Sequence, residues 1–187
     1  MLQYLRDHGK YAEIAGYRNI KFDKLEAFLK ANRKQTRQNI DIQFFDANLI
    51  ATQEHLYFAV LNALQAFKNK TNLSKSPAME TILYASAQRQ IQKAIERCGI
   101  KPKTKSMALI IIGDDPKQIE NALEEVTKSV GSAPDISVLE ISKSKVTKIK
   151  KAFGITDQEL KTVEDSDPKK AIASLVIERV ALLATQL

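Results

Sequence analysis

Residues 107–112 read Met107-Ala108-Leu109-Ile110-Ile111-Ile112, and Gly113 ends this apolar run. A run that is so short and so uniformly apolar predicts a β-strand that is covered on both of its faces. Such a strand needs a layer of other elements on each side. The run therefore decides the fold class, which we expect to be a β-sheet with helices packed on it.

Other strands are predicted from alternating apolar and polar residues. The pattern occurs at residues 10–20, 40–45 and 136–141. Together with residues 107–112, these segments predict the α/β (α+β) class. We expect a single domain over residues 1–187, with a mixed β-sheet of about four to five strands and helices packed on it.

Helices are predicted where apolar periodicity follows a capping residue. They span residues 24–34, 52–70, 77–98, 116–130, 143–153, a short stretch after 156, and 168–183. The clearest start is Ser76-Pro77, and Gly99 is expected to end that helix in the left-handed conformation. Asp115 precedes Pro116, so a helix cap is favoured there over a magnesium ligand.

The composition excludes several classes of protein. Glycine and proline are scarce, at 6 and 5 of 187 residues, so long flexible linkers are not expected. No apolar run reaches about 18 residues and no signal-peptide pattern is visible, so we expect a cytoplasmic protein that does not contact a membrane. The single cysteine, Cys98, rules out a disulfide within the chain.

Motifs for catalysis and metal binding are missing from the sequence. It has no phosphate-binding glycine loop, dinucleotide fingerprint or nucleophile elbow. His8 and His55 are the only histidines, and with Cys98 they do not match the usual zinc spacings. A His–Cys catalytic pair stays open, but Cys98 is expected to be a buried thiol and His55 a packing or helix-end histidine. We therefore predict no enzyme activity, no cofactor and no metal.

Positive charge is concentrated in the first part of the chain. Residues 1–113 hold 18 Lys and Arg against 9 Asp and Glu, whereas residues 114–187 hold 11 against 13. The net charges of +9 and −2 favour a polyanion partner such as nucleic acid, with a solubilising surface as the alternative. Two lysine- and arginine-rich runs, at 30–37 and 143–151, compete with the basic row described next.

A row of basic residues is predicted on the helix at 77–98. Arg89, Lys93 and Arg97 recur every four residues and so share one face, with Gln88 beside them. Arginine and lysine bind phosphates, and glutamine can bind a base or sugar. The residues assigned to nucleic acid are Arg89, Lys93, Gln88, Lys68, Lys70, Lys75 and Arg97. The alternative is a solvated helix face.

The last predicted helix is apolar on nearly every side. Residues 171–184 are interrupted mainly by Glu178 and Arg179. Such a helix lies centrally in a core, or it divides its surface between the core and a protein interface. For the interface, the assigned residues are Ile172, Val176, Arg179 and Leu182.

Several segments, in order along the chain, resemble one known family. They are FFDANLI (44–50) with EHL (54–56), ETILYASAQRQI (80–91), FGIT (153–156) and ERVALL (178–183). This pattern is similar to the small regulatory, kinase-binding subunits of the KEOPS complex, the TPRKB-like proteins. Many members carry glycine in place of Ala87, and alanine limits how closely a nucleotide can approach there.

The resemblance implies a specific role. KEOPS makes N6-threonylcarbamoyladenosine in tRNA, and the chemistry belongs to a subunit with a sugar-kinase-like fold. Members of this family bind the Rio-like kinase/ATPase subunit of the complex and the single-stranded 3′ CCA end of tRNA, and they have no active site of their own. The resemblance thus implies tRNA and that kinase as partners. The alternative is a free-standing protein that binds structured RNA without a kinase.

Overall fold

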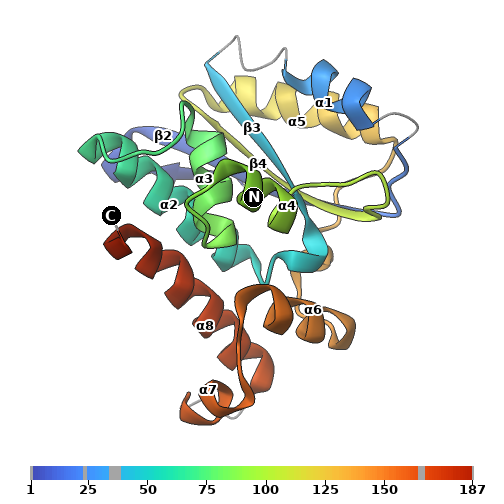
Figure 1. The fold of residues 1–187 in the computed structure, drawn as a ribbon. Helices are drawn as coiled ribbons and strands as arrows, with labels where there is room; N and C mark the ends of the chain where they lie inside the picture. Colours follow the sequence, from blue (N-terminus) through green and yellow to red (C-terminus); the bar gives the residue numbers. More distant parts are fainter. Residues whose placement is uncertain (1, 23–24, 34–38, 164–166, 187) are drawn as a thin grey trace.

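The β-sheet has four strands. The computed structural model describes residues 2–22, 25–33, 39–163 and 167–186 (Figure 1). The strands are β1 (Gln3–Leu5), β2 (Lys10–Arg18), β3 (Ile40–Asp46) and β4 (Ser106–Gly113), in the order β1-β2-β4-β3. The α+β class is confirmed, but each of the three pairings is antiparallel, so the expected mixed sheet is wrong for the described residues.

The described helices surround this sheet. They are α1 (Leu25–Arg33), α2 (Gln53–Asn69), α3 (Pro77–Ser86), α4 (Ile91–Cys98), α5 (Pro116–Val130), α6 (Lys143–Phe153), α7 (Asp157–Thr162) and α8 (Pro168–Leu182), with the 3-10 turns η1 (Arg6–His8), η3 (Ala47–Leu49), η4 (Ile136–Leu139) and η5 (Leu183–Gln186). No helix in the described part of the chain has the length and apolar character needed to cross a membrane. Asp23, which precedes the helix predicted at 24–34, and the basic residues Lys34 and Arg37 lie outside the described residues.

Strand β4 is buried on both faces, as its sequence predicts. Ile110 and Ile112 belong to a core shared with α2, α3 and α8. Leu109 and Ile111 belong to a second core, on the other face, that includes Ile119 of α5 and is flanked by side chains of α1. The helices on the two faces form the outer layers (Figure 1).

Side-chain caps at the start of five predicted helices are confirmed, whereas Ser142, before α6, makes no such bond. The side chains of Thr52, Ser76, Asp115 and Asp167 each accept a backbone N–H at the start of the predicted helix. Thr156 forms the predicted capping box with its helix. These bonds join residues two or three positions apart, which is why they can be predicted from sequence.

The strand predicted at 136–141 is wrong. Its residues instead begin with η4, because the carboxylate of Asp135 accepts the Ser137 N–H at 3.0 Å and starts a tight turn. The segment meets β2 through one backbone bond, from the Asp135 N–H to the Gly16 carbonyl at 2.7 Å. A Cβ on Gly16 would lie 2.4 Å from Val138 Cγ2, so this approach requires glycine.

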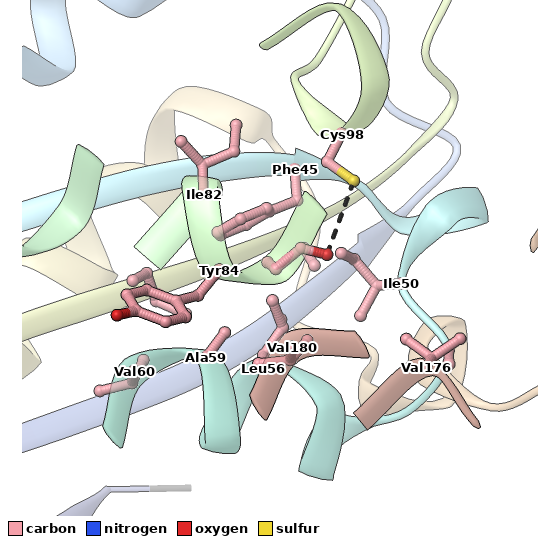
Figure 2. Packing of buried hydrophobic residues seen from close by; sticks show 14 of the residues in the cluster. Phe45, Ile50, Leu56, Ala59, Val60, Ile82, Tyr84, Cys98, Val176 and Val180 are labelled. Atoms are coloured by element: carbon pink, nitrogen blue, oxygen red, sulfur yellow. Dashed lines mark hydrogen bonds between the residues drawn. The ribbon is translucent and has the colours of Figure 1, made fainter. Parts of the chain in front are cut away.

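A buried hydrogen-bond junction joins α2, α3 and α4. The Ala51 N–H donates to His55 Nδ1 (3.1 Å), so Nε2 carries the proton and donates to the Ala85 carbonyl (2.8 Å). The Cys98 thiol approaches the same carbonyl at 4.0 Å (Figure 2). Burial lowers the pKa of His55 to about 4 and raises the pKa of Cys98 to about 12. Both residues are structural, as expected.

His55 makes stability depend on pH. The unfolded chain binds a proton at this ring below pH 6.5, whereas the folded chain does so only near pH 4. The free energy of unfolding should therefore fall by about 3 kcal/mol on this account as the pH drops from 6.5 to 4. His55→Gln keeps a hydrogen-bond donor for the Ala85 carbonyl but has no imidazole to protonate. Its free energy of unfolding should therefore decrease less between pH 6.5 and pH 4 than that of wild type, as measured by urea denaturation at several pH values. Parallel pH profiles for the two proteins would contradict the assignment.

Candidate nucleic-acid interface

A sharp corner separates α3 from α4. Ala87 has φ 48° and ψ 47°, the left-handed conformation, and ends α3. The Gln88 N–H donates to the Leu83 carbonyl at 3.0 Å, which closes the last turn. The single helix predicted at 77–98 is therefore wrong. The predicted end at Cys98 is confirmed for α4, but Gly99 is extended rather than left-handed, with φ −71°.

The corner divides the predicted basic row. Arg89 lies between the helices and is exposed, whereas Lys93 and Arg97 lie on α4. Arg97 donates to the Ser86 carbonyl at 2.8 Å, and its guanidinium lies 5.8 Å from the centre of the Phe153 ring in α6. Arg97 therefore links the corner to α6.

A basic groove lies between this corner and α6. It has a volume of about 720 Å³. Its lining consists of Leu49, Gln88, Lys93, Glu96, Arg97, Lys101, Lys148, Lys151 and Ala152. Two members of the predicted row, Lys93 and Arg97, thus line one groove with Lys148 and Lys151, which belong to the alternative basic run at 143–151. The sequence supplies these lysines but gives no signal that they meet.

Three of the assigned lysines lie at the other end of the α2–α3 pair. The start of α2 lies beside the end of α3, where His55 bonds to Ala85. Lys68, Lys70 and Lys75 flank the opposite ends of these helices, about 15 Å away by the length of α3. Lys68 donates to the carbonyl of Asp7 near β1. Of the seven assigned residues, the structure brings Gln88, Lys93 and Arg97 together in the groove.

The residues assigned to a protein interface on α8 have different surroundings. Ile172 and Val176 are 1% and 0% exposed, so they hold α8 to the core and do not present their side chains to a partner (Figure 2 shows Val176). Leu182 is 46% exposed. Arg179 is half-buried and donates to the carbonyl of Phe153 (2.8 Å) and to the carboxylate of Glu159 (2.6 Å).

These bonds fix α7 against α8. Hydrogen bonds from the Thr156 backbone and from Arg179 lower the pKa of Glu159 to about 2. The carboxylate is therefore ionised at neutral pH and keeps the arginine in place. Arg179 thus has a structural partner within the chain.

A second depression lies beside α8, at the start of α2. It has a volume of about 560 Å³. Its lining consists of Thr52, Glu54, Glu140, Ile141, Lys169, Lys170, Ala173, Ser174 and Ile177. Phe58 on α2 is also 39% exposed. The α2–α8 pair therefore offers apolar side chains to a partner beside charged ones.

The described residues include no group of three or more His, Cys, Asp or Glu side chains that could hold a metal ion. The thiol and imidazole of Cys98 and His55 are fully buried at the junction on Ala85. The His–Cys pair therefore has a structural arrangement, since both side chains face a backbone carbonyl.

Comparisons with known proteins agree on one family. The family model described as "Kinase binding protein CGI-121" matches residues 17–184. A "Regulatory protein Cgi121" from Methanocaldococcus jannaschii is 31% identical over 126 residues, which cover 67% of this chain and 79% of that protein. An "EKC/KEOPS complex subunit cgi121" from Aspergillus terreus is 25% identical over 145 residues, covering 75% of this chain and 72% of that protein.

The left-handed Ala87 gives a stability prediction. This conformation costs alanine about 1–2 kcal/mol, a cost that glycine does not have. Glycine also gives the unfolded chain more conformational entropy, which cancels part of the stability gained by the substitution. Ala87→Gly should therefore raise the free energy of unfolding by about 0.5–1 kcal/mol in urea denaturation. The exposed helical Ala181 is the control, because Ala181→Gly should lower it by about 1 kcal/mol. A loss of stability in both variants would contradict the strain at Ala87.

Proposed function

The chain belongs to the CGI-121 family of kinase-binding proteins, and we propose that it is a non-catalytic subunit of a KEOPS complex that binds both tRNA and the Rio-like kinase/ATPase subunit. In this role it recruits tRNA, including the 3′ CCA end, for N6-threonylcarbamoyladenosine formation. The chemistry takes place in the subunit with the sugar-kinase-like fold, which the kinase connects to this chain.

The basic groove is the observation that carries the tRNA part of the proposal. Five cations line it, and Glu96 is the one carboxylate among the described residues of its lining. Lysine and arginine at this density bind the phosphates of a strand, and Arg97 has the planar shape that suits them. Gln88 lies in the same lining and supplies an amide for a base or sugar.

The exposed apolar residues of α2 and α8 support the kinase part. Large apolar side chains at the surface of a folded protein favour a protein partner when they accompany a depression. Leu182 is the exposed member of the assigned α8 set, and Ile177 lines the depression at the start of α2. The partner surface that we propose therefore includes Leu182 and the outer side of α8, while Ile172 and Val176 support it from below.

The tRNA proposal predicts a dependence on the CCA end. Wild-type protein should bind tRNA more tightly than the same tRNA lacking CCA, as measured by fluorescence anisotropy. Lys93→Glu with Lys101→Glu should weaken binding roughly tenfold at low salt and lower its salt dependence, since two phosphate contacts are lost. Lys117→Glu with Lys128→Glu on α5 makes the same charge change on the other side of the sheet and is the control. Equal affinity for the two tRNAs would reject CCA recognition.

The kinase proposal predicts a separation between folding and binding. Leu182→Glu should leave the fold intact and abolish capture of the purified kinase subunit. Leu73→Glu is the control, because Leu73 has a similar exposure of 43% in the loop between α2 and α3. Ile172→Glu should unfold the protein, since it buries a carboxylate in the core.

The capture experiment also addresses the alternative function. Kinase binding by folded Leu182→Glu at wild-type affinity would reject Leu182 as a contact. Failure of the wild-type protein to bind any kinase subunit, with RNA binding retained, would favour the free-standing RNA-binding protein.

A further inference from the structure

The basic groove adjoins a second depression. Lys101 and Lys148 line both hollows, so the two lie side by side. The second depression is lined by Asp46, Asn48, Lys101, Lys103, Thr104, Lys105, Ser106 and Lys148. We name the two together the basic trough. It runs from the corner at Gln88 between α4 and α6 to the loop at 101–105.

A hydrogen-bond network forms the floor of the trough under the 101–105 loop. Thr104 is 5% exposed, and its hydroxyl donates to Asp46 at 3.4 Å and accepts the Lys101 N–H at 2.9 Å. With Thr104 buried, Lys103 and Lys105 on either side of it are exposed. The loop therefore presents its lysines to solvent in a fixed arrangement.

The trough carries a large excess of positive charge. Seven cations line it: Lys93, Arg97, Lys101, Lys103, Lys105, Lys148 and Lys151. The carboxylates of the lining are Glu96 and Asp46, and Asp46 accepts hydrogen bonds from both nitrogens of Asn48. Within the described part of the chain, no carboxylate lies within 4 Å of any of the seven cations. These charges are therefore not neutralised by a neighbouring carboxylate, although Arg97 donates to the Ser86 carbonyl and Lys148 to Asn48 Oδ1.

In its described residues, the trough lacks stacking platforms for bases. No aromatic ring occurs among its described lining residues, so bases have no platform on which to stack. Its basic part ends at a third depression, which shares Asn48 and Ser106 with the second. Glu140 lines that hollow beside Arg18, Lys145 and Lys169, but Arg18 is paired with Asp135 and Lys145 donates to the Val138 carbonyl. Among the described residues that line these three hollows, the cations without an ion-pair or backbone partner are therefore concentrated in the trough.

We propose that the basic trough binds an extended single strand of RNA through its sugar–phosphate backbone, so that the footprint continues past Lys101 to Lys103 and Lys105. The inference rests on the proposed tRNA-binding function and extends it: the strand end lies in the groove near Gln88, and the preceding nucleotides follow the trough. Recognition along this path is independent of base sequence, since phosphates carry no sequence information.

The test compares two fluorescein-labelled RNAs, the trinucleotide CCA and a nine-nucleotide strand that ends in CCA. Lys103→Gln with Lys105→Gln should leave trinucleotide binding unchanged and weaken binding of the longer strand. The slope of log K against log salt for the longer strand should become shallower by about 1.4, since two phosphate contacts are lost. The ratio of the wild-type to the variant binding constant for the longer strand should thus fall about sevenfold between 50 and 200 mM salt. Lys117→Gln with Lys128→Gln is the control of equal charge.

The outcomes separate this proposal from the one on which it rests. If the variant binds the nine-nucleotide strand like wild type, while both bind the trinucleotide, the extended footprint is rejected and CCA recognition stands. Equal weakening for both lengths would place the two lysines at the strand end and would also overturn the trough. Failure of wild type to bind tRNA or either strand would reject both proposals.

Discussion

The burial of β4 on both faces is the constraint on which the rest of the structure depends. Each of its isoleucines contributes about 1.5–3 kcal/mol when it leaves water, so a helix layer on one face alone would forfeit half of this gain. The antiparallel sheet places β4 between β2 and β3, and α2, α3 and α8 cover one face while α1 and α5 cover the other. Both candidate binding surfaces lie on the outside of these layers.

The corner at Ala87 determines the RNA-binding surface that we propose. The Ala85 carbonyl accepts a hydrogen bond from His55 Nε2 and faces the thiol of Cys98, so the end of α3 is connected to α2 and α4 at one point. Beyond this point the chain reverses and α4 lies close to α6, with Arg97 bonded to Ser86 and placed over Phe153. A straight helix would have carried Arg89, Lys93 and Arg97 along one face. The corner instead leaves Arg89 outside the groove lining, while Lys93 and Arg97 on α4 lie opposite the lysines of α6.

Helix α8 has one side buried in the core and one side exposed at the surface. Its inner residues, such as Val176 and Val180, are fully buried, and Arg179 is fixed by Glu159 and by the Phe153 carbonyl. Its outer side still exposes Leu182. A helix that is apolar on nearly every side is therefore divided between a core that is present within this chain and a surface that suits a protein partner. The two uses are compatible because they involve different faces of the helix.

The sequence by itself determined the features that depend on neighbouring residues. The caps at Thr52, Ser76, Asp115, Thr156 and Asp167 and the doubly buried strand could be predicted, because capping bonds and apolar runs are local. Only the tertiary structure decided the break at Ala87, since residues 87–90 hold neither glycine nor proline and the helix ends there through packing around Ala85. The meeting of Lys93 with Lys148 was likewise decided by tertiary structure, because residues 55 positions apart become neighbours only when the intervening chain has folded.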